Sequence, residues 1–173
     1  MSSVLAATSA RGREEVTVSE VQVKAAYMHR VAGLVDWPAG SFSSPVASLV
    51  IGIAGADPVY EELSRQVTAR LVQGRPVEVQ RVSDAQSSVA VHLLYIGKGG
   101  GRNSEALLGR VAGRPVLTVT DNPEGLIAGA VLNLVEVDGR IRFEASMSAA
   151  AAQRLKLSSR LLAVATRVLD KTP

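Results

Sequence analysis

The chain contains no cysteine. It can therefore form no disulfide, offer no thiolate nucleophile and hold no metal ion through sulfur. Aromatic residues are scarce, at 3% of 173 residues, so the core must be built from Val, Leu, Ile and Ala. No run of about 18 apolar residues occurs, and the sequence predicts no membrane-spanning helix.

The sequence also contains few residues that could form a catalytic or metal site. The histidines are His29 and His92, and neither has a metal-ligand partner at helical or hairpin spacing. His29 falls on the polar side of a predicted helix, as a solvated histidine would, and His92 opens a strand as a capping or core residue. No serine lies in a nucleophile elbow. We predict no enzyme, no catalytic residue, no metal and no cofactor.

The net charge is mild, at +3 from 19 basic and 16 acidic residues. The basic excess lies near the C-terminal end, where it is dispersed and has no aromatic residue among it. Nucleic-acid-binding proteins usually carry a denser basic stripe with aromatics for base stacking. We therefore predict no nucleic-acid binding.

The chain length fits a single domain, which can bury about 70% of its unfolded surface. We predict this domain over residues 17–170. Residues 1–16 are predicted to be a flexible leader or a signal-peptide remnant, because Thr8-Ser9-Ala10 is typical of the tail of a cleavage site. A plain disordered leader is the alternative.

The first ordered element is predicted to be a helix from about residue 18 to 34. Thr17 and Glu20 have the spacing of a capping box, and Asp36-Trp37-Pro38 ends the helix. Two apolar stripes run along this helix. Together they cover a wider part of its circumference than the single apolar stripe of a typical surface helix. The first stripe comprises Val21, Ala25, Met28, Ala32 and Val35. The second comprises Val23, Tyr27, Val31 and Leu34, and is either a dimer or partner interface or a face covered within the domain.

Strands alternate with helices along the rest of the chain. Strands are predicted over residues 49–54, 77–82, 92–96 and 116–120. Helices are predicted from Asp57-Pro58 onward, through Ala106, Leu107 and Val111, and over residues 147–154 and 159–169. The second helix should bury Tyr60, Leu63, Val67 and Leu71 and end at Gly74. The fold class is therefore α/β: one domain with a central mixed β-sheet flanked by helices, a C-terminal β-hairpin and a helix pair.

The β-hairpin is the most informative segment. Asp138-Gly139 is a favoured two-residue turn, and it sets Asn133 opposite Glu144. The resulting apolar face comprises Leu132, Leu134, Ile141 and Phe143. The other face carries Asn133, Arg140, Arg142 and Glu144, which we predict to bind a carboxylate or zwitterionic ligand or a partner. The alternative is a solvated sheet face with a diagonal ion pair.

A glycine-rich segment at residues 97–102 follows a strand and precedes a helix. Backbone amides in such a place can hold an anion. The segment matches neither the dinucleotide fingerprint nor the Walker pattern, so a flexible surface turn is the favoured interpretation.

Three segments together resemble the YfiR-like family. The first is the entry helix with its exit, VKAAY at residues 23–27 and VDWP at 35–38. The second is GRPV at residues 74–77, running into the strand before Ile96-Gly97. The third combines GRPVLTVTD at 113–121, the hairpin at 133–144 and LSSRLL at 157–162. The resemblance covers nearly the whole chain and makes residues 17–170 a single YfiR-like domain.

The resemblance implies an α/β fold, export to the periplasm and a tendency to form homodimers. It also implies a partner, the periplasmic part of an inner-membrane diguanylate cyclase or related sensor. Direct binding would repress that enzyme and so lower cyclic di-GMP and biofilm formation. Relatives often carry cysteines near Gly52 and Val91, where this chain has none, so disulfide-based redox control is excluded.

A second function class stays open. A periplasmic binding protein that delivers an anionic or zwitterionic metabolite would also use a polar hairpin face. The two classes overlap if such a small-molecule ligand controls the repression.

Overall fold

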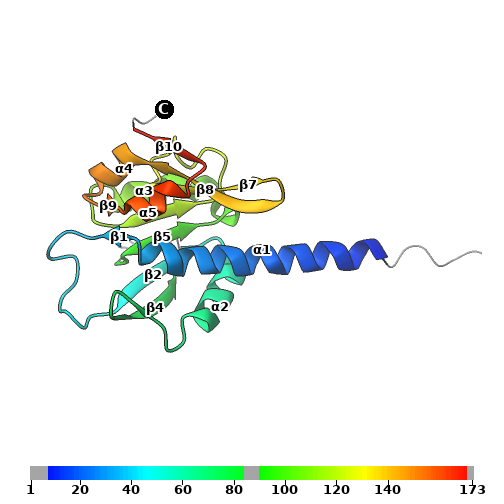
Figure 1. The fold of residues 1–173 in the computed structure, drawn as a ribbon, viewed down its shortest axis with the longest axis horizontal. Helices are drawn as coiled ribbons and strands as arrows, with labels where there is room; N and C mark the ends of the chain where they lie inside the picture. Colours follow the sequence, from blue (N-terminus) through cyan, green and yellow to red (C-terminus); the bar gives the residue numbers. More distant parts are fainter. Residues whose placement is uncertain (1–7, 84–89, 171–173) are drawn as a thin grey trace, which may run out of the picture.

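The computed structural model describes residues 8–83 and 90–170. Its centre is an eight-stranded sheet in the order β10-β8-β7-β6-β5-β2-β4-β3 (Figure 1). The strands are β2 (Leu49–Ala54), β3 (Leu71–Val72), β4 (Arg75–Arg81), β5 (Leu93–Ile96), β6 (Leu117–Thr120), β7 (Leu132–Val137), β8 (Arg140–Ser146) and β10 (Arg167–Leu169). Strands β4, β2, β5, β6 and β7 are parallel, whereas β3–β4 and β7–β8 pair antiparallel. The predicted mixed α/β fold is confirmed.

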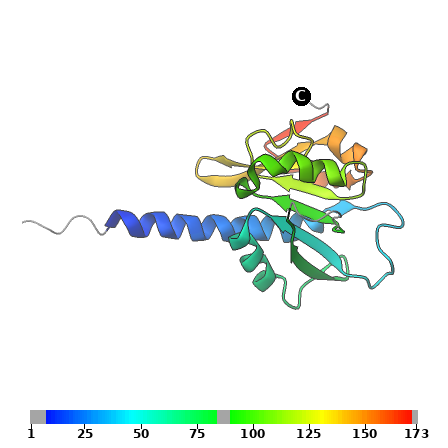
Figure 2. The same ribbon diagram turned by 180° about the vertical axis from the view of Figure 1, so that it is seen from behind.

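Helices cover both faces of the sheet. The helical segments are α1 (Thr8–Ala32), α2 (Asp57–Gln66), the 3₁₀ turn η1 (Lys98–Asn103), α3 (Ser104–Val111), α4 (Met147–Ala152) and α5 (Ser159–Ala163). Residues of α1, α2, α4 and α5 share the larger hydrophobic core with one sheet face. Figure 2 shows α3 against the opposite face, where Leu107 and Val111 belong to the smaller core. A two-stranded ladder of β1 (Val35–Asp36) and β9 (Lys156–Leu157) lies apart from the main sheet.

Helix α1 lies across the sheet, and its N-terminal part extends beyond the rest of the domain (Figures 1 and 2). The helix begins at Thr8, so the predicted start near residue 18 is wrong and position 17 is not its N-cap. Glu20 instead pairs with Lys24 one turn later, at 2.6 Å. The predicted leader is therefore helical from Thr8 onward, and its residues 1–7 lie outside the described residues.

The two apolar stripes of α1 have different environments. Ala25, Met28 and Ala32 of the first stripe are buried, as predicted. In the second stripe Val31 is buried as well, which corrects the interpretation of the whole stripe as an accessible interface. Tyr27 and Leu34 pack partly against the core, and Val23 alone of the second stripe is exposed, at 37%. The surplus apolar surface of this helix is thus mostly covered within the domain.

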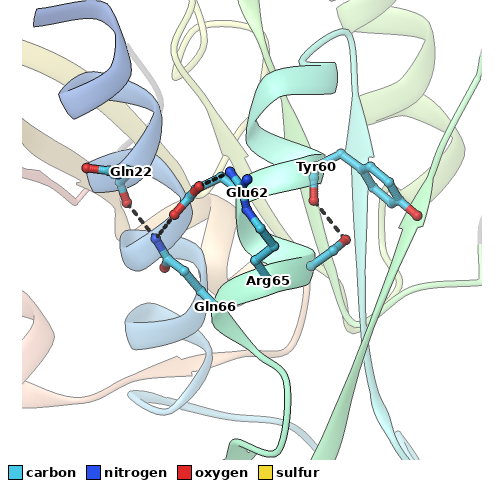
Figure 3. Close-up of polar contacts among 6 residues, drawn as sticks. Gln22, Tyr60, Glu62, Arg65 and Gln66 are labelled. Atoms are coloured by element: carbon cyan, nitrogen blue, oxygen red, sulfur yellow. Dashed lines mark hydrogen bonds and ion pairs between the residues drawn. The ribbon is translucent and has the colours of Figure 1, made fainter. Parts of the chain in front are cut away.

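Helix α2 buries Val59 and Leu63 against the sheet and α1. Figure 3 shows the polar link to α1: the Gln66 amide donates to Gln22 O at 3.2 Å and to Glu62 Oε1 at 2.9 Å. The prediction that Gly74 ends this helix is wrong. The helix ends at Gln66, and Gly74 takes a positive φ of 75° in the turn between β3 and β4.

Leu71, predicted to be buried on α2, lies in β3 and is 61% exposed. The chain leaves the helical path before it, because Ala69 adopts a φ of 59° in the turn after the helix.

The hairpin register is confirmed. Asn133 pairs with Glu144 and Val137 with Arg140, and Asp138 and Gly139 have the positive φ values of 50° and 71° that this turn requires.

The end of the chain differs from the prediction. Ser158 caps α5, because Leu161 N donates to its Oγ at 3.2 Å. However, α5 ends at Ala163, and residues 167–169 form β10, parallel to β8. Thr166 directs this change, because its backbone N and its hydroxyl both donate to Phe143 O at 2.9 Å.

Candidate functional site

An open groove of about 890 Å³ lies between α1, the end of α2 and the β7–β8 hairpin. Its lining joins two sets of residues that the sequence suggested separately. Val23 and Tyr27 come from the second stripe of α1, and Arg140 and Arg142 come from the polar hairpin set. Arg70, which follows α2, is a third contribution. This groove is the candidate functional site.

The groove is basic. Its lining contains the four arginines Arg30, Arg70, Arg140 and Arg142, against the two glutamates Glu20 and Glu136. Glu20 is already neutralised in part by its contact with Lys24. Within residues 8–83 and 90–170, no ion pair is made by any of the four arginines. Their guanidinium groups are thus available to carboxylate or phosphate oxygens from outside the chain.

Tyr27 fixes the groove floor. Its hydroxyl donates to Ile141 O at 3.0 Å, which joins α1 to β8. Its ring meets the ring of Phe143 edge-on, with centroids 6.0 Å apart and planes at 72°. The Tyr27 side chain is therefore held in place by contacts within the chain. Little of its conformational entropy remains to be lost if a ligand or another protein binds to it.

His29 lines the same groove and is not the freely solvated histidine that the sequence indicated. It is half-buried, and its Nε2 is buried without a hydrogen-bond partner in the described part of the chain. Burial lowers the pKa of His29, and the positive charge of Arg70 lowers it further. The imidazole therefore stays neutral beside the arginines at neutral pH.

The four predicted hairpin residues do not share one environment. Asn133 is 2% exposed, and its Oδ1 accepts a hydrogen bond from Thr120 Oγ1 at 2.7 Å. Glu144 forms a bidentate pair with Arg167 of β10 at 3.0 and 3.1 Å. These two residues bind structural partners, and only Arg140 and Arg142 line the groove.

A buried ion pair secures α1 beside the groove. Lys24 Nζ lies 2.6 Å from Asp121 Oδ2, with the two residues 8% and 7% exposed. Burial lowers the pKa of Lys24, but the hydrogen bonds to Asp121 and Glu20 outweigh it, so the pKa is raised. Burial also raises the pKa of Tyr95, and the charge of Asp121 adds to that rise. The sequence prediction missed this pair, because its members are 97 positions apart.

His92 has the structural role that the sequence favoured. Its Nδ1 accepts from Val50 N at 3.0 Å, and its Nε2 donates to Ser41 O at 3.0 Å. The ring stacks on Phe42, with centroids 4.2 Å apart. Burial lowers the pKa of His92, in keeping with a neutral ring that fixes the loop between β1 and β2.

The glycine-rich segment is explained by packing. A Cβ at Gly99 would lie 2.5 Å from Gly55 O, and one at Gly97 would lie 2.9 Å from the same oxygen. The segment folds as η1 against the end of β2, so its glycines permit a close approach of two backbones.

Over the described residues no group of acidic and histidine side chains could hold a metal ion, and no helix there is long and apolar enough to cross a membrane.

Gly52 and Val91, near which the resemblance implies cysteines in relatives, are neighbours. A Cβ at Gly52 would lie 2.8 Å from Val91 Cγ1.

Residues 21–166 match the DUF4154 family, described as YfiR/HmsC-like. This range includes every groove residue except Glu20 and all strands of the main sheet except β10. No curated protein is similar enough to count as a relative. The family is regulatory and not catalytic, is periplasmic and acts through partner proteins. The match covers most of the chain, and the chain therefore belongs to the YfiR/HmsC-like family.

Proposed function

We propose that this protein is a periplasmic regulator that represses a membrane-bound diguanylate cyclase by direct binding. Repression would lower cyclic di-GMP and so reduce biofilm formation. The observation that carries the proposal is the family match over residues 21–166, which covers the C-terminal part of α1, the hairpin and every strand of the sheet except β10. The partner surface would be the periplasmic part of the cyclase.

The chemistry of the groove agrees with binding rather than turnover. Arginines and a rigid tyrosine line it, and both residue types are enriched where proteins contact one another. No nucleophile paired with a base lies among its lining residues. A regulator that acts through a partner needs such a recognition surface and no catalytic group.

Release of the repression must use chemistry other than thiol oxidation in this chain, because the chain has no cysteine. Ligand binding or a competing partner are the classes of signal compatible with its composition.

Deleting the gene is expected to raise cyclic di-GMP in the host and to increase surface attachment, because the cyclase loses its inhibitor. Cyclic di-GMP is measured in extracts of wild-type, deletion and complemented strains. Complementation with the intact gene should restore the low level. Equal cyclic di-GMP and equal attachment in all three strains would refute the repressor function.

The second candidate is a periplasmic binding protein that delivers an anionic or zwitterionic metabolite. Two features favour it: the groove volume is within the range of small-molecule sites, and its arginines suit carboxylates. A delivery protein predicts a growth defect on that metabolite in the deletion strain, with cyclic di-GMP unchanged.

A further inference from the structure

We propose that the basic groove between α1 and the hairpin binds an acidic, partly apolar segment of the partner protein. This inference rests on the proposed function and names the surface through which the repression would act. The observations that carry it are the charge of the groove, its apolar floor and the rigid placement of Tyr27.

Charge complementarity selects an acidic occupant. Arg30 lies on α1, Arg70 follows α2, and Arg140 and Arg142 lie on β8, so positive charge borders the groove on three elements. Arg30, Arg70, Arg140 and Arg142 are all exposed. Guanidinium groups bind carboxylates with two parallel hydrogen bonds, and complementary charge also speeds association. A partner segment with several Asp or Glu residues fits this arrangement.

The apolar floor of the groove favours an occupant that also has apolar side chains. Val23 is 37% exposed, Ala26 is exposed, and the Tyr27 ring is fixed by Ile141 O and Phe143. Burying such apolar surface stabilises a complex. An occupant with carboxylates at its rim and aliphatic side chains at its centre would satisfy both parts of the groove.

A second copy of this chain is a poorer occupant of the groove. A symmetric dimer places the same patch of each protomer against its equivalent, so the arginines of one groove would face those of the other. Like charges in direct opposition are destabilising. The homodimer predicted from the sequence stays a prediction, and it would need another surface.

The test reverses the charge of the groove in the intact chain. Arg140→Glu with Arg142→Glu is compared with Arg114→Glu, an exposed arginine outside the groove. We expect the double variant to raise cyclic di-GMP to the level of the deletion strain, while Arg114→Glu keeps it at the wild-type level. Both proteins should accumulate in the periplasm and unfold within a few degrees of wild type, because all three side chains are exposed.

Suppressors of the double variant identify the occupant. We expect replacements of Asp or Glu by Lys or Arg in the periplasmic part of a membrane-bound cyclase, since these restore opposite charge across the contact. Suppressors that alter only this chain, or that change apolar partner residues alone, would overturn the charge-based inference.

The remaining outcomes separate the two proposals. If gene deletion raises cyclic di-GMP but the double variant represses normally, the groove is not the docking surface and the regulatory function stands. If gene deletion has no effect, the regulatory function itself fails.

Two outcomes would assign the groove to another occupant. A changed oligomeric state of the double variant in sedimentation would assign the groove to a second copy. Calorimetric binding of free glutamate or phosphate that the double variant loses, with repression intact, would assign it to a small anion.

Discussion

Replacing Lys24 with methionine is expected to destabilise the protein by about 3–5 kcal/mol, because the substitution leaves the carboxylate of Asp121 buried without its counter-ion. Asp121 is 7% exposed and lies 2.6 Å from the Lys24 ammonium, so solvent cannot replace the lost charge. Methionine keeps the apolar stem of lysine, and the effect therefore reports the ion pair. For a chain of this size the loss corresponds to a fall in Tm of about 6–20 °C.

Two further variants separate this effect from a general loss of packing. Lys24→Met combined with Asp121→Asn should recover much of the lost stability, because no uncompensated charge then remains buried. Arg65→Met breaks an ion pair with Glu62 in which the arginine side chain is 74% exposed, and it should lower the stability far less than Lys24→Met. If Lys24→Met were no more harmful than Arg65→Met, the buried pair would contribute nothing to the attachment of α1.

Gly55→Ala is the second substitution with a large expected effect, about 2–5 kcal/mol. Gly55 has a φ of 63°, and an added Cβ would lie 2.1 Å from the backbone nitrogen of Gly100. The positive φ costs a non-glycine residue about 1–2 kcal/mol, and overpacking typically adds about 1–3 kcal/mol. Because the clash is with backbone atoms, η1 must move away from the end of β2.

Gly40→Ala is the matched control in guanidinium unfolding. Gly40 also has a positive φ, of 85°, but a Cβ there would meet nothing within 4 Å. Its substitution by alanine should lower the stability only through the unfavourable positive φ, by about 1–2 kcal/mol. Equal losses at both positions would contradict the close approach of η1 to Gly55.

Local patterns predicted the features whose causes are local. The hairpin register followed from Asp138-Gly139, since a primed turn fixes which residues oppose each other. The first stripe of α1 followed from helical periodicity, because apolar side chains spaced three and four residues apart lie on one face of a helix. Each of these signals lies within a few residues of the structure that it determines.

Predictions failed where a tertiary contact overrides the local pattern. The apolar spacing of Leu161, Ala165 and Val168 is helical, yet residues 167–169 pair with β8 because that strand offers free backbone groups along its edge. Gly74 has the properties of a helix C-cap, but the same φ freedom serves the β3–β4 turn.

The polar hairpin face shows a third limit of sequence reasoning. Its orientation was correct, but its exposure was not, because the segment between β6 and β7 covers one end. A Cβ at Gly125 would lie 1.8 Å from Thr120 Oγ1 and 2.8 Å from Asn133 Oδ1. The close passage of this segment buries Asn133, and no local pattern near the hairpin signals it.

The groove could not be predicted as a unit. Its arginines come from α1, the turn after α2 and β8, and only the folded chain brings them together. The sequence did single out Val23, Tyr27, Arg140 and Arg142, because apolar excess on a helix and charge on a strand are visible in the pattern. Arg30 and Arg70 carried no such signal.

The most direct test of repression through the groove is photo-crosslinking in living cells. A photoreactive amino acid replaces Val23, which lines the groove and is 37% exposed, and a second strain carries it at Arg114 as the control. We expect an adduct with a membrane-bound diguanylate cyclase from position 23 and none from position 114. If the adducts from position 23 contain only a second copy of this chain, or contain no cyclase, repression through the groove is contradicted.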